Sequence, residues 1–217
     1  MPADVALRRV AALLAVLAVA ALPGCSHDAG RSAAQDPTTS AAPPPTTSVT
    51  LPPDPLLALV PTPSEVPAGL VPVVAGSGPR DLAAVAGFSG DPAAAAAALR
   101  AHGFAGAYVA QYAEPTAAGA SGRVLSVVVS RFGTLKGAAD DLAGDVAAGG
   151  GPGTTPDVGQ AASLRTQPLP GAARGRLTTL RFRVGTRTFL LALGAPAADE
   201  DTVVRLGRLL AARATPA

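Results

Sequence analysis

The sequence contains no tryptophan, isoleucine or asparagine, and only one cysteine and one lysine. Aromatic residues make up 3% of the chain, so a core has to be assembled from leucine, valine, alanine and a few phenylalanines. The missing asparagine removes the acceptor for N-linked glycans. Much of the 48% hydrophobic content is alanine, which buries little area per residue. The composition therefore predicts one modest domain within the 217 residues.

Residue types that carry out chemistry are equally scarce. The two histidines, His27 and His102, and the lone Cys25 have no spacing typical of a metal site. Neither a GxSxG motif nor a transpeptidase cysteine occurs, and His102 is better placed to cap a helix than to activate a nucleophile. The run from Gly149 to Gly153 follows a helix and has no lysine behind it, unlike a phosphate-binding loop. We therefore expect no enzyme activity, no catalytic residue, no cofactor and no metal ion.

The net charge of +2 gives no whole-chain argument for nucleic acid, and we expect no such partner. Six arginines nevertheless lie between Arg165 and Arg187 without an acidic residue among them. They are either the solvated face of strands or a strip that binds phosphate or carboxylate groups of a cell envelope. Alternation along a strand explains the strip, because Arg181 and Arg183 would face outward while their neighbours face inward.

The first 24 residues follow the plan of a secretory signal. Arg8 and Arg9 precede an apolar run of 13 residues, from Val10 to Leu22. A helix of that length would span about 20 Å, whereas the hydrocarbon core of a bilayer is about 30 Å thick. The run therefore predicts a cleaved leader rather than a permanent membrane span.

The residues Leu22-Pro23-Gly24-Cys25 resemble a bacterial lipobox, with leucine three positions before the cysteine and glycine directly before it. Pro23 departs from the small residue that is usual at its position. The resemblance implies removal of residues 1–24, a diacylglyceryl group on the sulfur of Cys25, and attachment to the outer face of the cell membrane. At least two acyl chains give lasting attachment, which one chain does not. Cys25 is therefore the predicted lipidation site, and membrane lipid is its partner.

Residues 26–55 are rich in proline, threonine, serine and alanine, with scarcely any large apolar side chain. Such a segment cannot bury enough surface to offset the entropy lost on ordering, so it predicts a disordered tether. The expected organisation is a signal peptide over 1–24, a lipidated N-terminus and linker over 25–55, and a single domain over 56–217.

Three helices of that domain are predicted from their caps and periodicity. Asp91 is placed to cap a helix over 92–102, and Thr134 to cap an amphipathic helix over 134–148. A terminal helix over 198–214 has acidic residues at its start and arginines toward its end, which complement the helix dipole. In the second helix we expect Asp140 and Asp141 to be solvated and the buried face to comprise Leu135, Ala138, Leu142 and Val146.

Alternating apolar runs predict five strands, of which the last two form a hairpin through Gly185-Thr186. Phe104, Tyr108 and Tyr112 fall on one side of the first strand and are expected in the core rather than on a ligand-stacking platform. With the helices, this order predicts an α+β fold in which helices pack on one face of an antiparallel sheet. The predicted strands span 104–114, 123–132, 158–166, 177–184 and 187–193.

Three phrases, LRAHGFAGAYVAQY, VVVSRFGTLKGAADDL and LRFRVGTRTFLLALG, resemble domains of actinobacterial, mycobacterial-type surface lipoproteins, some of them similar in fold to the PsbP-like family. The resemblance covers about residues 90–213. It implies an extracytoplasmic binding or accessory module that contacts an envelope protein, polymer or lipid. The alternatives are a carrier of lipid or glycolipid, which would need a large apolar cavity, and an envelope enzyme.

Overall fold

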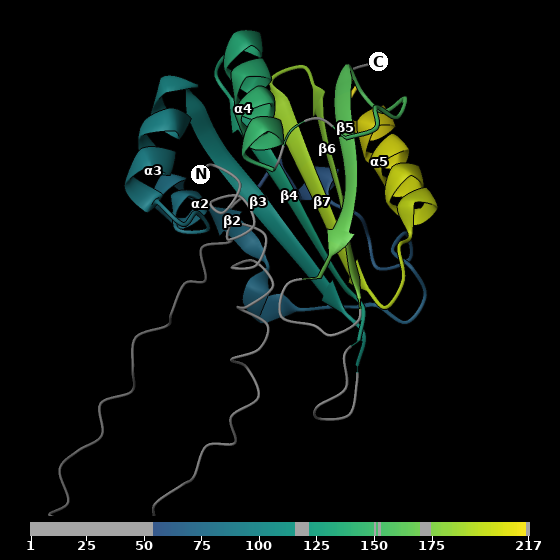
Figure 1. The fold of residues 1–217 in the computed structure, drawn as a ribbon. Helices are drawn as coiled ribbons and strands as arrows, with labels where there is room; N and C mark the ends of the chain where they lie inside the picture. Colours follow the sequence, from purple (N-terminus) through teal and green to yellow (C-terminus); the bar gives the residue numbers. More distant parts are fainter. Residues whose placement is uncertain (1–53, 116–121, 150, 152, 170–174, 216–217) are drawn as a thin grey trace, which may run out of the picture.

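The computed structural model describes residues 54–115, 122–149, 151, 153–169 and 175–215. The predicted signal peptide, Cys25 and all but the last two residues of the predicted linker lie outside this part of the chain. The described residues form one sheet with helices around it (Figure 1). This confirms the predicted α+β class.

All seven strands pair antiparallel, in the order β1-β3-β4-β7-β6-β5, and β2 also pairs with β3. The antiparallel sheet is therefore as predicted. β6 and β7 form the predicted hairpin, in which Gly185 has a φ of 58° and Thr186 has no positive φ, as a type II′ turn requires. The strands are β1 (Val71–Pro72), β2 (Gly78–Arg80), β3 (Phe104–Ala113), β4 (Val124–Phe132), β5 (Ala161–Pro168), β6 (Arg176–Val184) and β7 (Arg187–Ala195).

The helices begin where the sequence places their caps. The Asp91 carboxylate accepts a hydrogen bond from the Ala94 amide at 3.0 Å, and the Thr134 hydroxyl accepts one from the Gly137 amide at 2.9 Å. Asp199 caps the terminal helix in the same way. The helices are α2 (Leu82–Ala86), α3 (Pro92–Ala101), α4 (Leu135–Ala148) and α5 (Glu200–Ala214), with two 3₁₀ turns, η1 (Leu57–Leu59) and η2 (Val74–Gly76).

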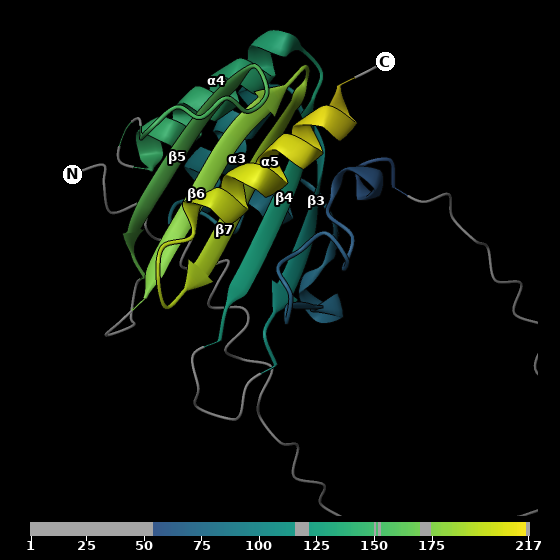
Figure 2. The same ribbon diagram turned by 90° about the vertical axis from the view of Figure 1, so that its right-hand side faces the viewer.

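Helices cover both faces of the sheet, which corrects the expectation that they pack on one face. Figure 2 shows α5 crossing in front of the strands, with α3 and α4 behind them. Successive side chains of a strand point to opposite faces. On β7, Leu191 packs in the core beneath α5, whereas Leu190 packs in the cluster that contains Val85 and Phe88. Because the central strands carry apolar side chains on both faces, each face needs a covering layer.

The larger core lies between the sheet and α5. Phe182 and Phe189 are directly opposite each other on β6 and β7, and their rings stack with centroids 4.5 Å apart and planes 2° apart. Gly207 allows α5 to approach closely, because a Cβ there would lie 2.4 Å from Leu180 Cδ2. Both phenylalanines and Leu180 are at most 1% exposed. Stacked rings and a close helix therefore fill this space, although the chain is poor in aromatic residues.

The segment 54–70 completes the core on the α5 face of the sheet. The Tyr112 hydroxyl of β3 donates a hydrogen bond to the Pro61 carbonyl, and burial raises the pKa of that hydroxyl to about 12. Arg213 of α5 pairs with Glu65, and the hydrogen bonds that Glu65 accepts hold the pKa of its carboxyl below the usual value. Pro61 is thus fixed against β3 and Glu65 against α5.

Two of the three aromatic residues predicted to share one side of β3 do so. Tyr108 and Tyr112 pack in the core beneath α5, whereas Phe104 packs on the opposite face. A β-bulge between Phe104 and Gly106 inserts one residue, which reverses the side to which Phe104 points. There its ring meets Phe132 edge-on, with centroids 5.9 Å apart.

Helix α4 is rotated about its axis relative to the predicted face. Its buried residues are Gly137, Ala138 and Leu142, whereas Leu135 is 59% exposed. The helix contacts both the sheet and α3, so the side that it buries faces the corner between them rather than the sheet alone. This rotation turns Asp141 inward.

Candidate functional site

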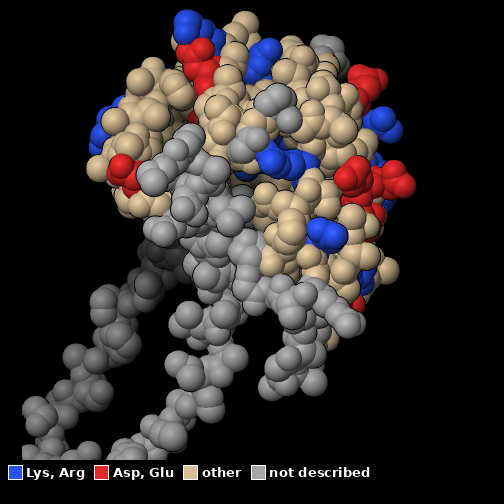
Figure 3. Space-filling view, viewed as in Figure 1, with Lys and Arg blue, Asp and Glu red and all other residues tan. Residues whose placement is uncertain are grey.

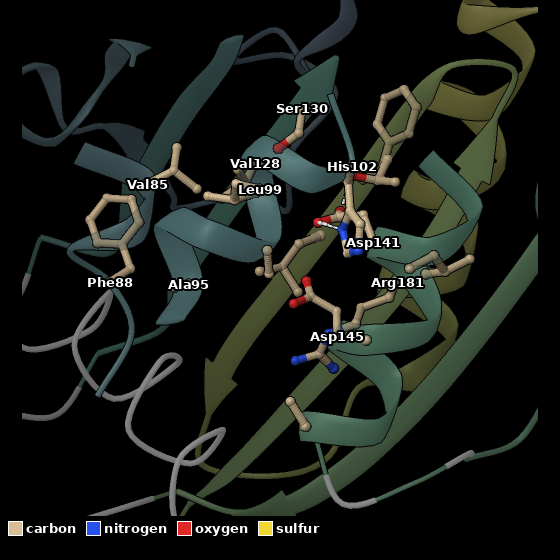
Figure 4. A pocket seen from close by; sticks show the side chains of 17 residues that line it. Val85, Phe88, Ala95, Leu99, His102, Val128, Ser130, Asp141, Asp145 and Arg181 are labelled. Carbon is tan, nitrogen blue, oxygen red and sulfur yellow. Dashed lines mark hydrogen bonds and ion pairs between the residues drawn. The ribbon is translucent and has the colours of Figure 1, made fainter. Parts of the chain in front are cut away.

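A cavity of about 200 Å³ lies between the sheet and helices α2, α3 and α4, on the face opposite α5 (Figure 4). Its walls are largely apolar, with Val85 and Phe88 from the α2 region, Leu99 from α3 and Leu190 from β7. Small side chains on α3, such as Ala95, leave the space open. The polar residues that line it are His102, Ser130, Asp141, Asp145, Arg181 and Thr188.

Asp141 of α4 lies at the centre of the polar end. Its Oδ2 atom accepts a hydrogen bond from the Thr188 hydroxyl at 3.1 Å. Its Oδ1 atom lies 3.9 Å from His102 Nδ1, and the Asp141 and His102 side chains are 15% and 23% exposed. The carboxylate is therefore held between β7 and the end of α3, in surroundings where its charge acts more strongly than in water.

Ser130 of β4 stands beside this contact. It is directly opposite Thr188 in the register of β4 and β7, and opposite residues of antiparallel strands have Cα atoms about 4.5–5.5 Å apart. Ser130 is 8% exposed, and its hydroxyl makes no hydrogen bond with another residue of the described part. The hydroxyl thus offers a donor and acceptor to the cavity.

Arg181 reaches the cavity from β6, beneath the C-terminal end of α4. A Cβ on Gly149, which ends that helix, would lie 3.3 Å from Arg181 Nη1. The negative end of the helix dipole favours a cation at this place. The expectation that Arg181 points outward from a solvated strand face is corrected, because α4 covers that face of the sheet.

Two other predictions about charged groups have different outcomes. His102 is the C-cap residue of α3, where its amide donates to the Ala98 carbonyl at 2.9 Å, so it lies at the helix end as predicted. Its imidazole lies 3.9 Å from Asp141, and its role in favouring the helix end stays a prediction. Of the two carboxylates expected to be solvated, Asp140 is 42% exposed and pairs with Lys136 at 2.6 Å. Asp141 instead lines the cavity, because α4 packs in the corner between the sheet and α3.

Several arginines of the basic strip bind backbone carbonyls. Arg165 Nη1 donates to the Gly149 carbonyl at 2.8 Å, at the end of α4, and Arg187 Nη1 donates to the Ala214 carbonyl at 3.3 Å, at the end of α5. On the face shown in Figure 3, cationic and anionic side chains are interspersed. These contacts favour a structural interpretation of the strip over one that binds anions.

The arrangement places hydrogen-bonding groups and charge at one end of an apolar space. Within the described residues, no group of three or more His, Cys, Asp or Glu side chains could hold a metal ion. Among the helices of the same part of the chain, none has the length and hydropathy needed to cross a bilayer. The cavity can hold a small molecule that has an apolar body and a polar head.

The sequence pattern points to His102, Asp141 and Arg181, but with other roles, and it does not bring Ser130 or Thr188 to the site. Ser130 had a signal, because it is a hydroxyl residue that directly follows three valines of a strand, whereas Thr188 follows an arginine and had a weaker one. A polar side chain buried in a strand needs a partner or a function. The apolar lining residues had no signal of their own, since nothing in the local pattern separates a cavity wall from a packed core.

No family model matches the chain, and no curated protein matches it. Among solved structures, the extracellular domain of PknH from Mycobacterium tuberculosis is similar, with a TM-score of 0.40 and 10% sequence identity. The alignment covers 54% of this chain and 68% of that one. Similarity at this level supports no inference about function.

Proposed function

We propose that this chain is an extracytoplasmic lipoprotein, held on the outer face of the cell membrane through Cys25, whose domain is a binding module for a small molecule. The observation that carries the proposal is the cavity between the sheet and α2, α3 and α4. Apolar walls with a few convergent polar groups, here Ser130, Asp141 and Thr188, are typical of small-molecule sites.

The size of the cavity limits the ligand. At about 200 Å³ it is comparable with an engineered apolar cavity of about 150 Å³ that binds benzene. Sites for drug-sized ligands are larger, about 300–1,000 Å³. The cavity therefore suits one ring-sized group. The alternative function, a carrier of lipid or glycolipid, would need room for whole acyl chains, so the volume favours the binding module.

The anchor is tested at Cys25. Wild-type chain from its native cells is expected in the detergent phase of a phase separation, with the mass of residues 25–217 plus a diacylglyceryl group. The Cys25→Ser chain is expected to carry no lipid mass, because serine offers no thioether sulfur. Ser26→Ala is the matched control and should remain lipidated. An unmodified sulfur on the wild-type protein would contradict the anchor.

The cavity is tested by filling it. Ala95 lines the cavity and is 5% exposed, whereas Ala97, on the same helix, is exposed and does not line it. We expect Ala95→Leu to weaken binding of benzyl alcohol, a ring-sized neutral probe, by at least about tenfold, since the leucine occupies the same space. Ala97→Leu should leave the affinity unchanged.

The measurement is an amide chemical-shift titration by NMR on the whole mature chain, residues 25–217, produced without its leader and with Cys25→Ser. Thermal unfolding of each variant establishes that it is folded. The shifts should be largest for residues around the cavity, such as Leu99 and Leu190. Absence of binding by the folded parent chain, or equal affinities of the two leucine variants, would refute the binding module.

A further inference from the structure

The sheet side of the cavity divides into an apolar end and a hydroxyl end. Val128 and Ser130 of β4 are two residues apart, so they point to the same face of the sheet, with Cα atoms about 7 Å apart. In the register of β4 and β7, Leu190 is directly opposite Val128, and Thr188 is directly opposite Ser130. Both pairs line the cavity. A ligand that lies against this part of the sheet therefore meets apolar side chains at one end and hydroxyl groups at the other.

Ser130 is the observation that points to a ligand at the hydroxyl end. It is 8% exposed, and its hydroxyl makes no hydrogen bond with another described residue. A buried hydroxyl without a partner costs free energy, which a hydrogen bond to a ligand would recover. His102 Nδ1 also makes no hydrogen bond among the described residues, but that atom is enclosed, 3.9 Å from Asp141 Oδ1. Ser130 Oγ, by contrast, lines the cavity within reach of a ligand (Figure 4).

Thr188 determines which kind of head fits beside Ser130. The Thr188 hydroxyl donates its hydrogen to Asp141 Oδ2 at 3.1 Å, so its oxygen can still accept but has no second hydrogen to donate. Directly opposite residues have Cβ atoms about 4.5–5.5 Å apart, so one ligand oxygen can reach both hydroxyl groups. A ligand hydroxyl can accept from Ser130 and donate to Thr188. A carbonyl or ether oxygen can only accept, so it would make one of these two hydrogen bonds.

The charged side chains of the lining are engaged in interactions of their own. Asp141 accepts from Thr188, and Asp141, Asp145 and Arg181 each make a further interaction. A charged ligand head would lose its hydration on entering a largely apolar space, in which the side chains of opposite charge already have partners. An uncharged hydroxyl loses much less hydration. Recognition by two hydroxyl groups also does not depend on whether His102 is protonated.

We infer that the cavity binds a small uncharged alcohol or phenol with a ring-sized apolar body. The ligand hydroxyl lies between Ser130 and Thr188, and the ring packs on Val128 and Leu190. The volume of about 200 Å³ has room for one such ring, since an engineered cavity of about 150 Å³ holds benzene. The inference rests on the proposed function, since it names the ligand class of the same site.

The test keeps the ring of the probe and changes its head, with toluene, benzyl alcohol, benzylamine and benzoate. In the NMR titration of the mature chain at pH 7, benzyl alcohol is expected to bind at least about tenfold more tightly than either charged probe. Ser130→Ala should weaken benzyl alcohol by about threefold to tenfold through the loss of one hydrogen bond, and should not weaken toluene, which has no head.

Ser126→Ala is the matched control. Ser126 is 1% exposed and points to the same face of β4, but it does not line the cavity, so both affinities should stay unchanged. A second measurement needs no substitution. The shifts that benzyl alcohol causes in the parent chain should exceed those caused by toluene most at the amides of Ser130 and Thr188. Thermal unfolding establishes that each serine variant is folded.

The outcomes separate the ligand class from the site. If the folded parent chain binds no probe, both the binding module and the ligand class are refuted. If benzylamine or benzoate binds as tightly as benzyl alcohol, the uncharged head is wrong and the cavity remains the binding site. If Ser130→Ala affects benzyl alcohol and toluene equally, or if the two probes shift the same amides, the placement of the hydroxyl is overturned.

Discussion

Replacing Gly137 with alanine is expected to lower the free energy of unfolding by about 3 kcal/mol, as urea denaturation of the mature chain would measure it. A Cβ at this position would lie 1.9 Å from the carbonyl oxygen of His102 and 2.9 Å from its carbonyl carbon. These are backbone atoms at the end of α3, which cannot rotate away as a side chain can. Helices α3 and α4 would have to separate, which would also open the polar end of the cavity between them.

Gly144→Ala, in the same helix, is the matched control. A Cβ there meets nothing within 4 Å. Alanine stabilises a helix interior relative to glycine by about 1 kcal/mol, so this variant is expected to raise stability. If Gly137→Ala were as stable as Gly144→Ala, the close approach of α4 to the end of α3 would be disproved.

Truncation of Phe182 to alanine is expected to cost about 3–5 kcal/mol, measured in the same way. The side chain is fully buried, and its ring stacks on Phe189 with centroids 4.5 Å apart. With 3% aromatic residues in the whole chain, few other side chains are large enough to collapse into the space that this ring would leave. The loss therefore combines the transfer of a large apolar group with the cost of a cavity.

Leu135→Ala provides the comparison for that variant. Leu135 is 59% exposed at the first position of α4, so its truncation should change stability by no more than about 0.5 kcal/mol. A loss at Phe182 that is no larger than the loss at Leu135 would contradict the packing described between β6, β7 and α5.

The starts of the helices and the hairpin could be predicted because their signals are local. Asp91 and Thr134 each bond an amide three residues further on, and Gly185 supplies the positive φ of a two-residue turn. The two helix caps and the turn each depend on a few neighbouring residues and not on the rest of the fold. Helix α2, by contrast, has five residues, which is too short for a periodic pattern to develop.

The side to which Phe104 points could not be predicted from alternation alone. The bulge that reverses it is marked by Gly106, whose φ is 137°. A glycine inside a strand is a known sign of such a bulge, whereas strict alternation of side chains assumes a strand without one. A single inserted residue then changes the face of every side chain on one side of the bulge.

The cavity depends on tertiary arrangement and had no local signature. The apolar stripe of α4 predicts that Asp141 is solvated, and only the position of α3 turns that residue inward. Likewise, the alternation of β6 places Arg181 opposite the core but does not reveal that α4 covers it. Where two helices pack against a sheet and against each other, the side chains that become buried depend on the positions of all three elements, which a local sequence pattern does not contain.

The segment 54–70 and the cavity lie on opposite sides of one sheet. Tyr112 and Arg213 hold that segment on one side through Pro61 and Glu65, and the proposed ligand binds on the other. An effect of an occupied cavity on that segment would therefore require a small displacement of the shared strands β4, β6 and β7.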